Sequence, residues 1–373
     1  QAEDGIRDPP YSLVGSEMCI RDSCVMSFDL RVAHTVEEVG QPEWDRLGGD
    51  QPFTSYRWYR FGEAVFASDV PVYLTLYRGG EPVARATFWL KRHESLPTPS
   101  RTVRFLAGRV LRRRPLLACR SPLSSTSGLI LPAPPHREAA LEAILLFAQE
   151  LERQHRASFL LFDYLDPTLM DWPGWPDGYV RMPNMSPGTQ LAVTWRDFEG
   201  YLAQMSKKRR YNIRRDYRLV AEEGITIAQY PAVMDLDKAM ELHRNVNKRY
   251  KAPTEMWMRP AMAHAGMVDA VWLAAEKEGK LVGCELMLGD RGTWLVTGLG
   301  LDLGARNVYF VLGYEDIQYA IEHGARTLRW GSETYDVKKR LGFEPEGYNN
   351  LIFASRWALL QSFGRWAAER SLY

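Results

Sequence analysis

The stretches YLTLYRGGEPVARATFWL (Tyr73 to Leu90) and WLAAEKEGKLVGCELML (Trp272 to Leu288) repeat one pattern in the two halves of the chain, and this repeat is the strongest indication of the fold. In each stretch an apolar strand enters a polar turn closed by glycine, Gly80 or Gly279, and a second apolar strand follows. Each hairpin precedes a helix and then a strand, at residues 136–154 and 159–162 and again at 308–321 and 327–330. Two such units predict a duplicated α/β protein, and a chance likeness between hairpins is the alternative.

The boundary between the halves is expected near Gly188. Residues 166–188 are rich in proline, tryptophan, aspartate and glycine, which predicts a loop. The halves are therefore predicted at 26–188 and 189–373. Residues 1–25 are interpreted as a non-native, adapter-like segment, because Ile-Arg-Asp occurs twice there without an amphipathic period or a signal-peptide layout, and Met26 is the expected natural start.

Composition indicates a globular protein. The chain has 373 residues, 46% hydrophobic and 25% charged, which is enough for two domains with cores of their own. It contains no run of ~18 apolar residues, so no membrane span is predicted. The four cysteines are too few and too scattered for a disulfide framework or a zinc site, which predicts reduced thiols, a cytoplasmic location and no metal. The small net charge does not indicate nucleic acid by itself.

One helix is strongly basic. Seven of the twelve residues from Lys207 to Arg218 are Lys or Arg, and only Asp216 opposes them in that window. Like charges at a spacing of four repel one another, and a phosphate-bearing ligand would relieve the repulsion. The predicted anion-binding residues are Lys208, Arg210, Arg214 and Arg218. A solvated helix face is the alternative.

Three residues in the second half are candidates for proton transfer. Glu285 lies in an apolar strand, either at a solvated edge or lining a cleft, where desolvation would raise its pKa toward that of a general base. Glu333 follows a strand end, the usual place for site residues in open α/β sheets. His243 lies on the apolar stripe of a helix, so a hydrogen-bonded core histidine is the alternative to a base.

Three passages resemble the GNAT acyltransferase superfamily, specifically its double-domain branch with the Fem-type peptidyltransferases. They are YLAQMSKKRRYNIRRDYRLVAEEGI (Tyr201 to Ile225), YEDIQYAIEHGARTLRWG (Tyr314 to Gly331) and YDVKKRLGFEP (Tyr335 to Pro345). The resemblance covers about residues 28 to 355. It implies an α/β fold with mixed sheets in two tandem GNAT-like domains, and direct transfer of an acyl group to an amine.

The resemblance also implies a donor site in the second half. In GNAT enzymes the donor's pantetheine arm lies against a strand, here Thr293 to Leu301, and its pyrophosphate lies on the next loop, where helix N–H groups and the helix dipole favour anions. A tyrosine that protonates the departing thiolate is matched by Tyr335. The expected donor contacts are Leu299, Gly300, Leu301, Leu303, Gly304, Ala305, Arg306, Asn307, Tyr309, Lys338, Lys339 and Arg340.

Two departures bear on the donor. The loop reads DLGARN instead of the Arg/Gln-x-x-Gly-x-Gly/Ala of typical acetyl-coenzyme A enzymes, and Asp302 is unfavourable to phosphate. The long helical arm that some Fem-type ligases insert for a transfer-RNA donor is missing, which favours coenzyme A.

Three hypotheses follow. The first is an N-acyltransferase that uses acyl-coenzyme A, with acetyl as the expected group, as a co-substrate that is not permanently bound; the acceptor amine would lie between the halves. The second keeps the fold, with aminoacyl-tRNA as the donor and a peptidoglycan precursor or peptide as the acceptor. The third is an inactive double domain that only binds an anionic glycan or nucleic acid. No pattern of a covalent nucleophile is present.

Overall fold

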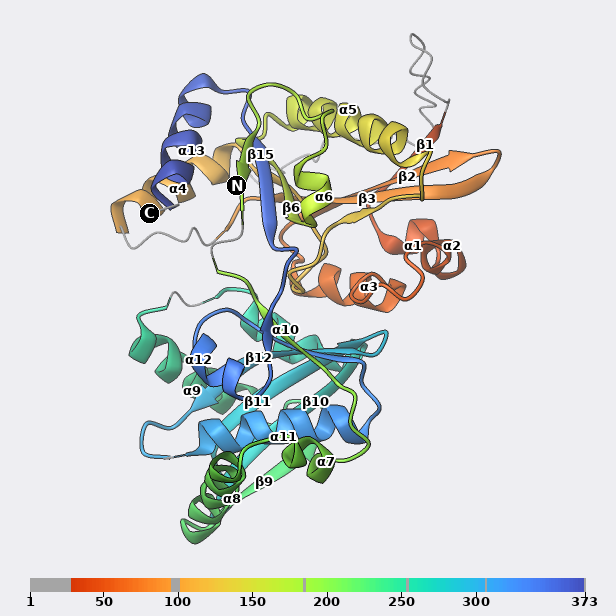
Figure 1. The fold of residues 1–373 in the computed structure, drawn as a ribbon. Coiled ribbons are helices and arrows are strands. Elements are labelled where there is room, and N and C mark those ends of the chain that lie inside the picture. Colours follow the sequence, from red (N-terminus) through yellow and green to blue (C-terminus); the bar gives the residue numbers. More distant parts are fainter. Residues whose placement is uncertain (1–27, 95–100, 184–185, 253–254, 306, 372–373) are drawn as a thin grey trace, which may run out of the picture.

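The computed structural model describes residues 28–94, 101–183, 186–252, 255–305 and 307–371. The predicted adapter-like segment, Met26, Cys19, Cys24 and Arg306 lie outside these ranges. Two mixed sheets with helices on their faces form two halves, one above the other in Figure 1. The prediction of an α/β protein with mixed sheets is confirmed. No helix in the described ranges combines the length and apolarity needed to cross a bilayer.

The first sheet gathers strands from both ends of the chain. Within the described residues its order is β1 (Asp29–Ala33), β2 (Val70–Arg78), β3 (Glu81–Lys91), β4 (Leu116–Cys119), β6 (Phe159–Leu165), β15 (Asn350–Ala354) and β7 (Val180–Met182), with β5 (Leu129–Ile130) paired to β3. The β4–β6 pair is parallel. One face packs on α5 (Arg137–His155), where Phe88 and Phe147 meet in an apolar core.

Several other helices pack on the opposite face of this sheet. They include α1 (Val36–Val39), α2 (Gln41–Arg46), α3 (Tyr56–Val65), α4 (Arg101–Arg113) and α13 (Ala358–Ser371). Ser55 caps α3 by accepting a hydrogen bond from the Trp58 backbone N–H, which fixes where this helix begins.

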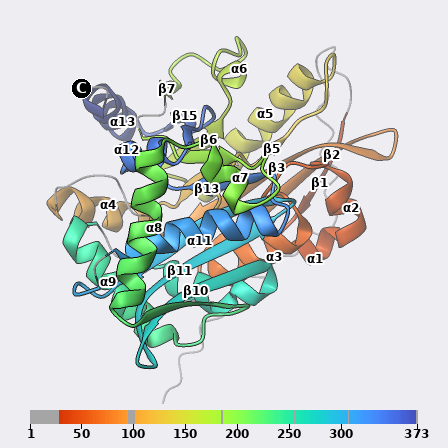
Figure 2. The same cartoon turned by 60° about the horizontal axis from the view of Figure 1, so that its bottom comes forward.

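The second sheet repeats the plan. Its order within the described residues is β14 (Glu344–Pro345), β8 (Thr189–Ala192), β13 (Thr327–Trp330), β12 (Thr293–Leu301), β11 (Lys280–Asp290), β10 (Asp269–Lys277) and β9 (Ile225–Tyr230). Figure 2 shows α8 (Lys207–Glu222) and α11 (Val308–Glu322) over one face. The other face packs on α9 (Leu236–Tyr250) and α10 (Met258–His264). Side chains of β11 alternate between the faces, so Leu286 and Met287 enter different cores.

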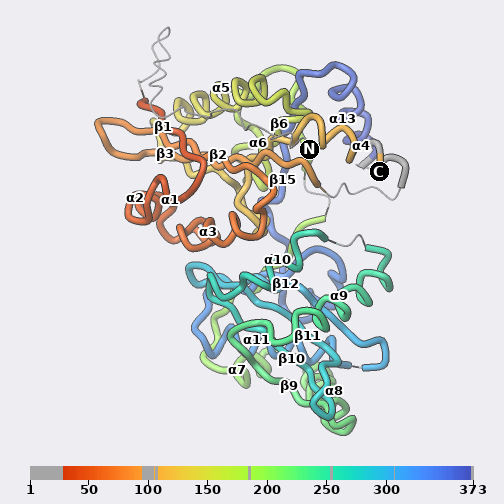
Figure 3. Tube along the Cα trace, turned by 180° about the vertical axis from the view of Figure 1, so that it is seen from behind, coloured from red at the N-terminus to blue at the C-terminus, as the bar shows by residue number. Residues whose placement is uncertain are grey.

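The two halves share buried contacts. One apolar cluster contains Trp58 and Phe61 from α3 and also Met262 from α10, and these helices face each other in Figure 3. The buried carboxylate of Asp290 accepts hydrogen bonds from the Ser55 hydroxyl at 2.6 Å and the Thr54 backbone N–H at 3.1 Å. The halves are therefore joined by apolar packing and by buried hydrogen bonds.

The repeated units predicted from the sequence are present. Hairpins β2–β3 and β10–β11 are each followed by a helix and a strand, namely α5 with β6 and α11 with β13. Ser206 caps α8, and Asp197 caps α7 (Phe198–Ala203).

Two details differ from the sequence interpretation. Residues 166–188 are not all loop, since they contain α6 (Pro167–Met170) and β7, whose three residues are too few to show a strand period. Strand β15, inside the predicted 189–373, returns to the first sheet and pairs with β6 and β7. Such pairing is set by residues far away in the chain. The boundary near Gly188 remains a prediction.

Candidate active site

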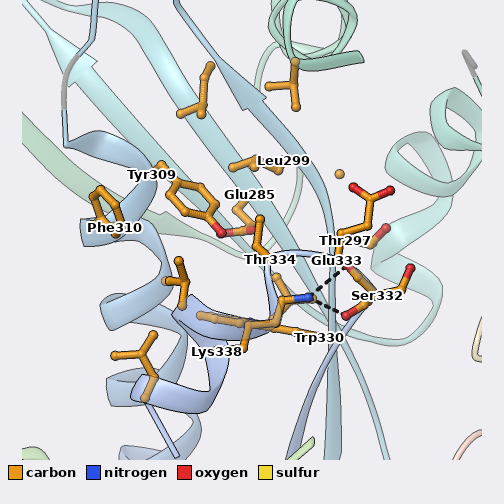
Figure 4. Close-up of a pocket in the computed structure, with 18 of the residues that line it drawn as sticks. Glu285, Thr297, Leu299, Tyr309, Phe310, Trp330, Ser332, Glu333, Thr334 and Lys338 are labelled. Atoms are coloured by element: carbon orange, nitrogen blue, oxygen red, sulfur yellow. Dashed lines mark hydrogen bonds between the residues drawn. The ribbon is translucent and has the colours of Figure 1, made fainter. Parts of the chain in front are cut away.

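Strands β12 and β13 diverge and open a cavity between them. They pair in parallel over only three residues each, from Thr293 to Leu295 and from Thr327 to Arg329, within the described chain. Beyond this point lies a cavity of about 250 Å³, lined by the second half of β12, the first turns of α11 and the loop that leads into α12 (Tyr335–Arg340). Figure 4 shows its lining side chains. The splayed strands create space for a ligand at the carboxyl end of β12.

A bulge in β12 shapes one wall of the cavity. Cys284 of β11 pairs with Gly300 and Leu286 pairs with Thr297, so two residues of β12, Gly298 and Leu299, lie opposite Glu285 alone. Gly298 has φ +67°, and a Cβ there would lie 2.9 Å from the Met262 methyl. The bulge therefore requires glycine and interrupts the ladder beside the cavity.

Glu285 and Asp316 form a buried carboxyl pair at the base of the cavity. Glu285 lines the cavity, whereas Asp316 of α11 is fully buried behind it. Neither Asp316 oxygen has a hydrogen-bond partner at normal distance and angle within the described residues. The polar groups nearby that influence its pKa include the Glu285 carboxyl and the Trp330 indole. Burial raises the pKa of both carboxyl groups, that of Asp316 most. Two adjacent buried carboxyls cannot both ionise cheaply, so the pair retains a proton near neutral pH.

Lys338 places a cation at the other side of the cavity. Its ammonium donates to the backbone carbonyls of Gly331 and Ser332, the latter at 3.0 Å. Burial lowers the pKa of Lys338 to about 8, while Glu333 and Glu285 raise it. The ammonium is therefore still largely protonated at pH 7 and can stabilise negative charge that develops nearby.

The loop before α12 has a strained backbone. Glu333 has φ +70° and Thr334 has φ +47°, the left-handed region that non-glycine residues rarely adopt. The Tyr309 phenol lies within hydrogen-bonding range of Thr334, and burial raises the pKa of this phenol, with the Glu285 charge adding to the effect. Figure 4 shows the Tyr309 hydroxyl directed toward Glu285. Strain of this kind is characteristic of functional loops.

Several sequence-predicted residues meet in this cavity. They are Glu285, Glu333, Leu299, Leu301, Tyr309 and Lys338. Two other candidates do not line it. The Tyr335 hydroxyl donates to the Pro187 carbonyl at 2.7 Å, at the protein surface. His243 is buried under β12, where Nδ1–H donates to the Leu299 carbonyl at 2.9 Å and Nε2 accepts from Asn247 at 3.1 Å, the arrangement of a core histidine.

The predicted pyrophosphate loop follows β12 directly. Gly300 is buried within the strand against α9, and a Cβ there would lie 2.8 Å from the Leu242 Cβ. Leu303 and Gly304 are exposed, and the Asp302 carboxylate accepts from the Gly304 N–H at 3.1 Å, so this acid occupies a donor that a phosphate would need. Ala305 comes next, and α11 begins after Asn307, whose side chain makes no capping bond.

Some basic residues of α8 pair with acids that lie outside the stretch from Lys207 to Arg218. Arg214 contacts Glu199 at 3.2 Å and Arg218 contacts Glu222 at 3.6 Å. Arg210 donates to the Met205 carbonyl. Lys208 is exposed, as are Lys339 and Arg340 on α12, and the Arg340 carbonyl accepts from Arg209, which joins the two helices at one end.

Sequence reasoning missed Asp316, Thr334 and Trp330. Asp316 interrupts the apolar face of α11, and the rule that selected Glu285, an acid among apolar residues, would also have selected it. Trp330 packs on Gly313, where a Cβ would lie 2.9 Å from its ring, and stacks on Phe343 at 4.3 Å. Only the folded chain reveals that this tryptophan lines the cavity.

Comparison with known proteins places the fold. The chain is similar to the solved structure of FemX, with a TM-score of 0.61 and 12% identity over 91% of this chain and 100% of that one. It is similar to a tandem GNAT protein from the clavulanic acid biosynthesis pathway, with a TM-score of 0.50 and 15% identity over 88% and 98% of the two chains. These likenesses support the prediction of two GNAT-like domains. No curated protein matches the sequence.

A family model named FemAB-like and described as peptidoglycan biosynthesis/recognition matches residues 35–370, most of the chain. The splayed strands, the bulge and the Lys338 loop all lie within this range, as do both sheets apart from β1. The chain therefore belongs to the FemAB-like family and is a transferase with the Fem-type, tandem GNAT-like architecture.

Proposed function

We propose that this protein transfers an acyl group from an activated donor, acyl-coenzyme A in the first instance, to an amine. The cavity between β12 and β13 carries this proposal, because it combines an apolar channel with a cation and a proton acceptor. The walls of this channel include Val296, Leu299 and Leu301, whose apolar side chains suit a flexible thioester arm. Lys338 and Glu285 lie where such an arm would end.

The reaction we propose needs no covalent enzyme intermediate. The amine nitrogen attacks the donor carbonyl, the C–N bond forms, and Lys338 stabilises the charge on the carbonyl oxygen. The C–S bond then breaks. Glu285 accepts the proton that the amine loses, and a proton passes to the departing thiolate from the Tyr309 hydroxyl, which then recovers it from the carboxyl pair. We assign the leaving-group role to Tyr309, which lines the cavity, in place of Tyr335.

The acceptor amine is proposed to enter between the halves. A cavity of about 630 Å³ lies there, lined by Arg329 and Tyr348 from the second half and by Arg137 and Tyr164 from the first. These polar and aromatic groups suit a peptide or a cell-wall precursor. The buried free thiols Cys119 and Cys284 are consistent with a proposed cytoplasmic location.

One observation favours aminoacyl-tRNA as a second candidate donor. Lys207, Lys208, Lys339 and Arg340 are exposed and have no ion pair within the described chain, and the Arg209–Arg340 contact brings their helices together. Such a basic surface suits the phosphate backbone of a nucleic acid. The family match accords equally with this donor.

A transfer assay with two donors tests the proposal. The full chain is incubated with radiolabelled acetyl-coenzyme A, or with charged tRNA, together with small amines and peptidoglycan-precursor peptides. Label in the acceptor from the thioester supports the first donor, and label only from tRNA, with a rate that falls steeply with salt, supports the second. Absence of transfer from both donors, with donor binding shown by thermal shift, would overturn the proposed reaction.

A further inference from the structure

Helix α13 exposes a stripe of large apolar side chains. Leu359 is 87% exposed, Phe363 43% and Trp366 47%, and their spacing of four and three residues puts them on one face of the helix. The opposite face packs on the first sheet, where a Cβ on Gly364 would lie 2.7 Å from the Phe353 ring. The sheet thus holds α13 with its apolar stripe outward.

Helix α4 extends the same surface. Its Leu111 packs with Phe159 on the sheet face that α13 also covers, and the Arg114 guanidinium lies 3.3 Å from the centre of the Trp357 ring, just before α13. Phe105 of α4 is 61% exposed. Figure 1 shows both helices on this side of the first half.

The charge around the stripe is strongly positive. The exposed charged residues of the two helices, among those whose side chains are described, are Arg109, Arg112, Arg113, Arg365, Arg370 and a single acid, Glu369. Arg370 lies over the Trp366 ring at 4.4 Å and in line with the stripe. The described part of the chain supplies no ion-pair partner to these arginines, in contrast with Arg214 and Arg218 of α8.

We propose that α13 and α4 form a docking face for an anionic lipid bilayer, with Leu359, Phe363 and Trp366 in the acyl–headgroup boundary and the arginines at the level of the lipid phosphates. Tryptophan and phenylalanine beside arginine suit this boundary, where one environment is apolar and the next is charged. This proposal does not depend on the reaction above.

Other occupants fit the face less well. A second copy of the chain would set the five arginines against five more, and such like charges repel. A nucleic acid would satisfy the arginines but would leave Leu359 and Phe363 in water. An anionic bilayer satisfies both kinds of side chain.

Vesicle flotation tests the proposal. The full chain is mixed with vesicles of phosphatidylcholine and phosphatidylglycerol at 3:1, and with vesicles of phosphatidylcholine alone. We expect binding to the anionic vesicles and much weaker binding to the neutral ones. The triple variant Leu359→Ser, Phe363→Ser, Trp366→Ser should bind the anionic vesicles more than about tenfold more weakly than the wild type. A second triple variant, Arg109→Gln, Arg113→Gln, Arg370→Gln, should lose about fivefold in vesicle affinity for each arginine removed.

A control variant separates docking from general loss of apolar surface. Val70→Ser, Leu146→Ser and Met234→Ser remove side chains that are 49%, 45% and 66% exposed on other elements, and vesicle binding should be unchanged. The proposal is overturned if the wild-type chain stays with the vesicle-free fraction, or if the apolar variant binds as the wild type does. A dimer in light scattering that the apolar variant abolishes would identify a second copy as the occupant and would also overturn it.

Discussion

Arg329, the last residue but one of β13, donates to the Thr126 hydroxyl of the first half at 3.1 Å, and so links the two halves through a buried guanidinium. The same group donates to the Ser125 carbonyl and pairs with Glu346, which is almost fully buried. The donor half is thereby anchored to the first half one residue before Trp330, which lines the cavity.

Replacing Arg329 should destabilise the protein strongly. Arg329→Met leaves the Glu346 carboxyl buried without its partner, which costs about 3–5 kcal/mol in comparable cases. The free energy of unfolding from urea titration measures the loss. Arg326→Met is the matched control, because its pair with Asp50 is exposed and is worth about 0–1 kcal/mol. Equal effects of the two variants would contradict the anchoring role.

Glu285→Gln should reduce turnover while leaving donor binding intact. Glutamine keeps the shape of the side chain but cannot accept the amine proton, and general base catalysis is worth about 10²–10⁴-fold in rate. Steady-state kinetics with either donor give kcat, and thermal shift gives donor binding. Glu322→Gln, on the exposed end of α11, is the control. A Glu285→Gln enzyme of normal kcat would exclude this residue as the proton acceptor.

The Glu285–Asp316 pair should make stability depend on pH. Burial raises both folded-state pKa values above the ordinary 4.5 and 3.8, so the folded state binds protons more tightly than the unfolded state. The stabilisation is fully present below the ordinary pKa values and is lost as the pH rises through the folded-state ones. Asp316→Asn removes one titrating group, so its Tm relative to wild type should increase between pH 5 and pH 8. The idea fails if the two Tm curves stay parallel.

Lys338→Met should lower kcat/KM and alter its pH dependence. Because the pKa of Lys338 is about 8, the wild-type rate should decline as the pH rises through 8 and the ammonium loses its proton. The variant has no such group, so this alkaline decline should be absent from its profile. Lys280→Met, at the exposed start of β11, serves as the control. An alkaline decline that survives in Lys338→Met would have to come from another residue.

Gly298→Ala should impair donor binding more than backbone strain alone explains. Both Gly298 and Gly279 have positive φ, +67° and +72°, so alanine is strained at either position. Only at Gly298 would the new Cβ meet a neighbour, the Met262 methyl at 2.9 Å. Unfolding and donor titration of both variants should show a larger loss for Gly298→Ala. Similar losses would mean that the bulge tolerates a side chain.

The sequence predicted the elements well where local pattern decides them. The hairpins, the helix expected at 308–321 and the apolar strand that holds Glu285 all follow from periods of two or 3.6 residues. Features set by distant contacts could not be predicted in this way. Three such features are the proximity of Asp316 to Glu285, the ion pair of Glu199 with Arg214, and the hydrogen bond that turns the Tyr335 hydroxyl to Pro187. They depend on how α11, α7 and α12 pack, which no local period records.

The return of β15 to the first sheet has a consequence for biosynthesis. The Asn350 side chain donates to the Leu165 carbonyl across 185 residues of chain. Because the ribosome adds ~5–20 residues per second, the edge of β6 stays unpaired for roughly 10–40 s before β15 has been synthesised. An unpaired strand edge invites pairing with other nascent chains. Crowded ribosomes and slow codons after β6 are therefore the conditions under which newly made copies would aggregate, and an N-terminal fragment expressed alone would inherit the same open edge.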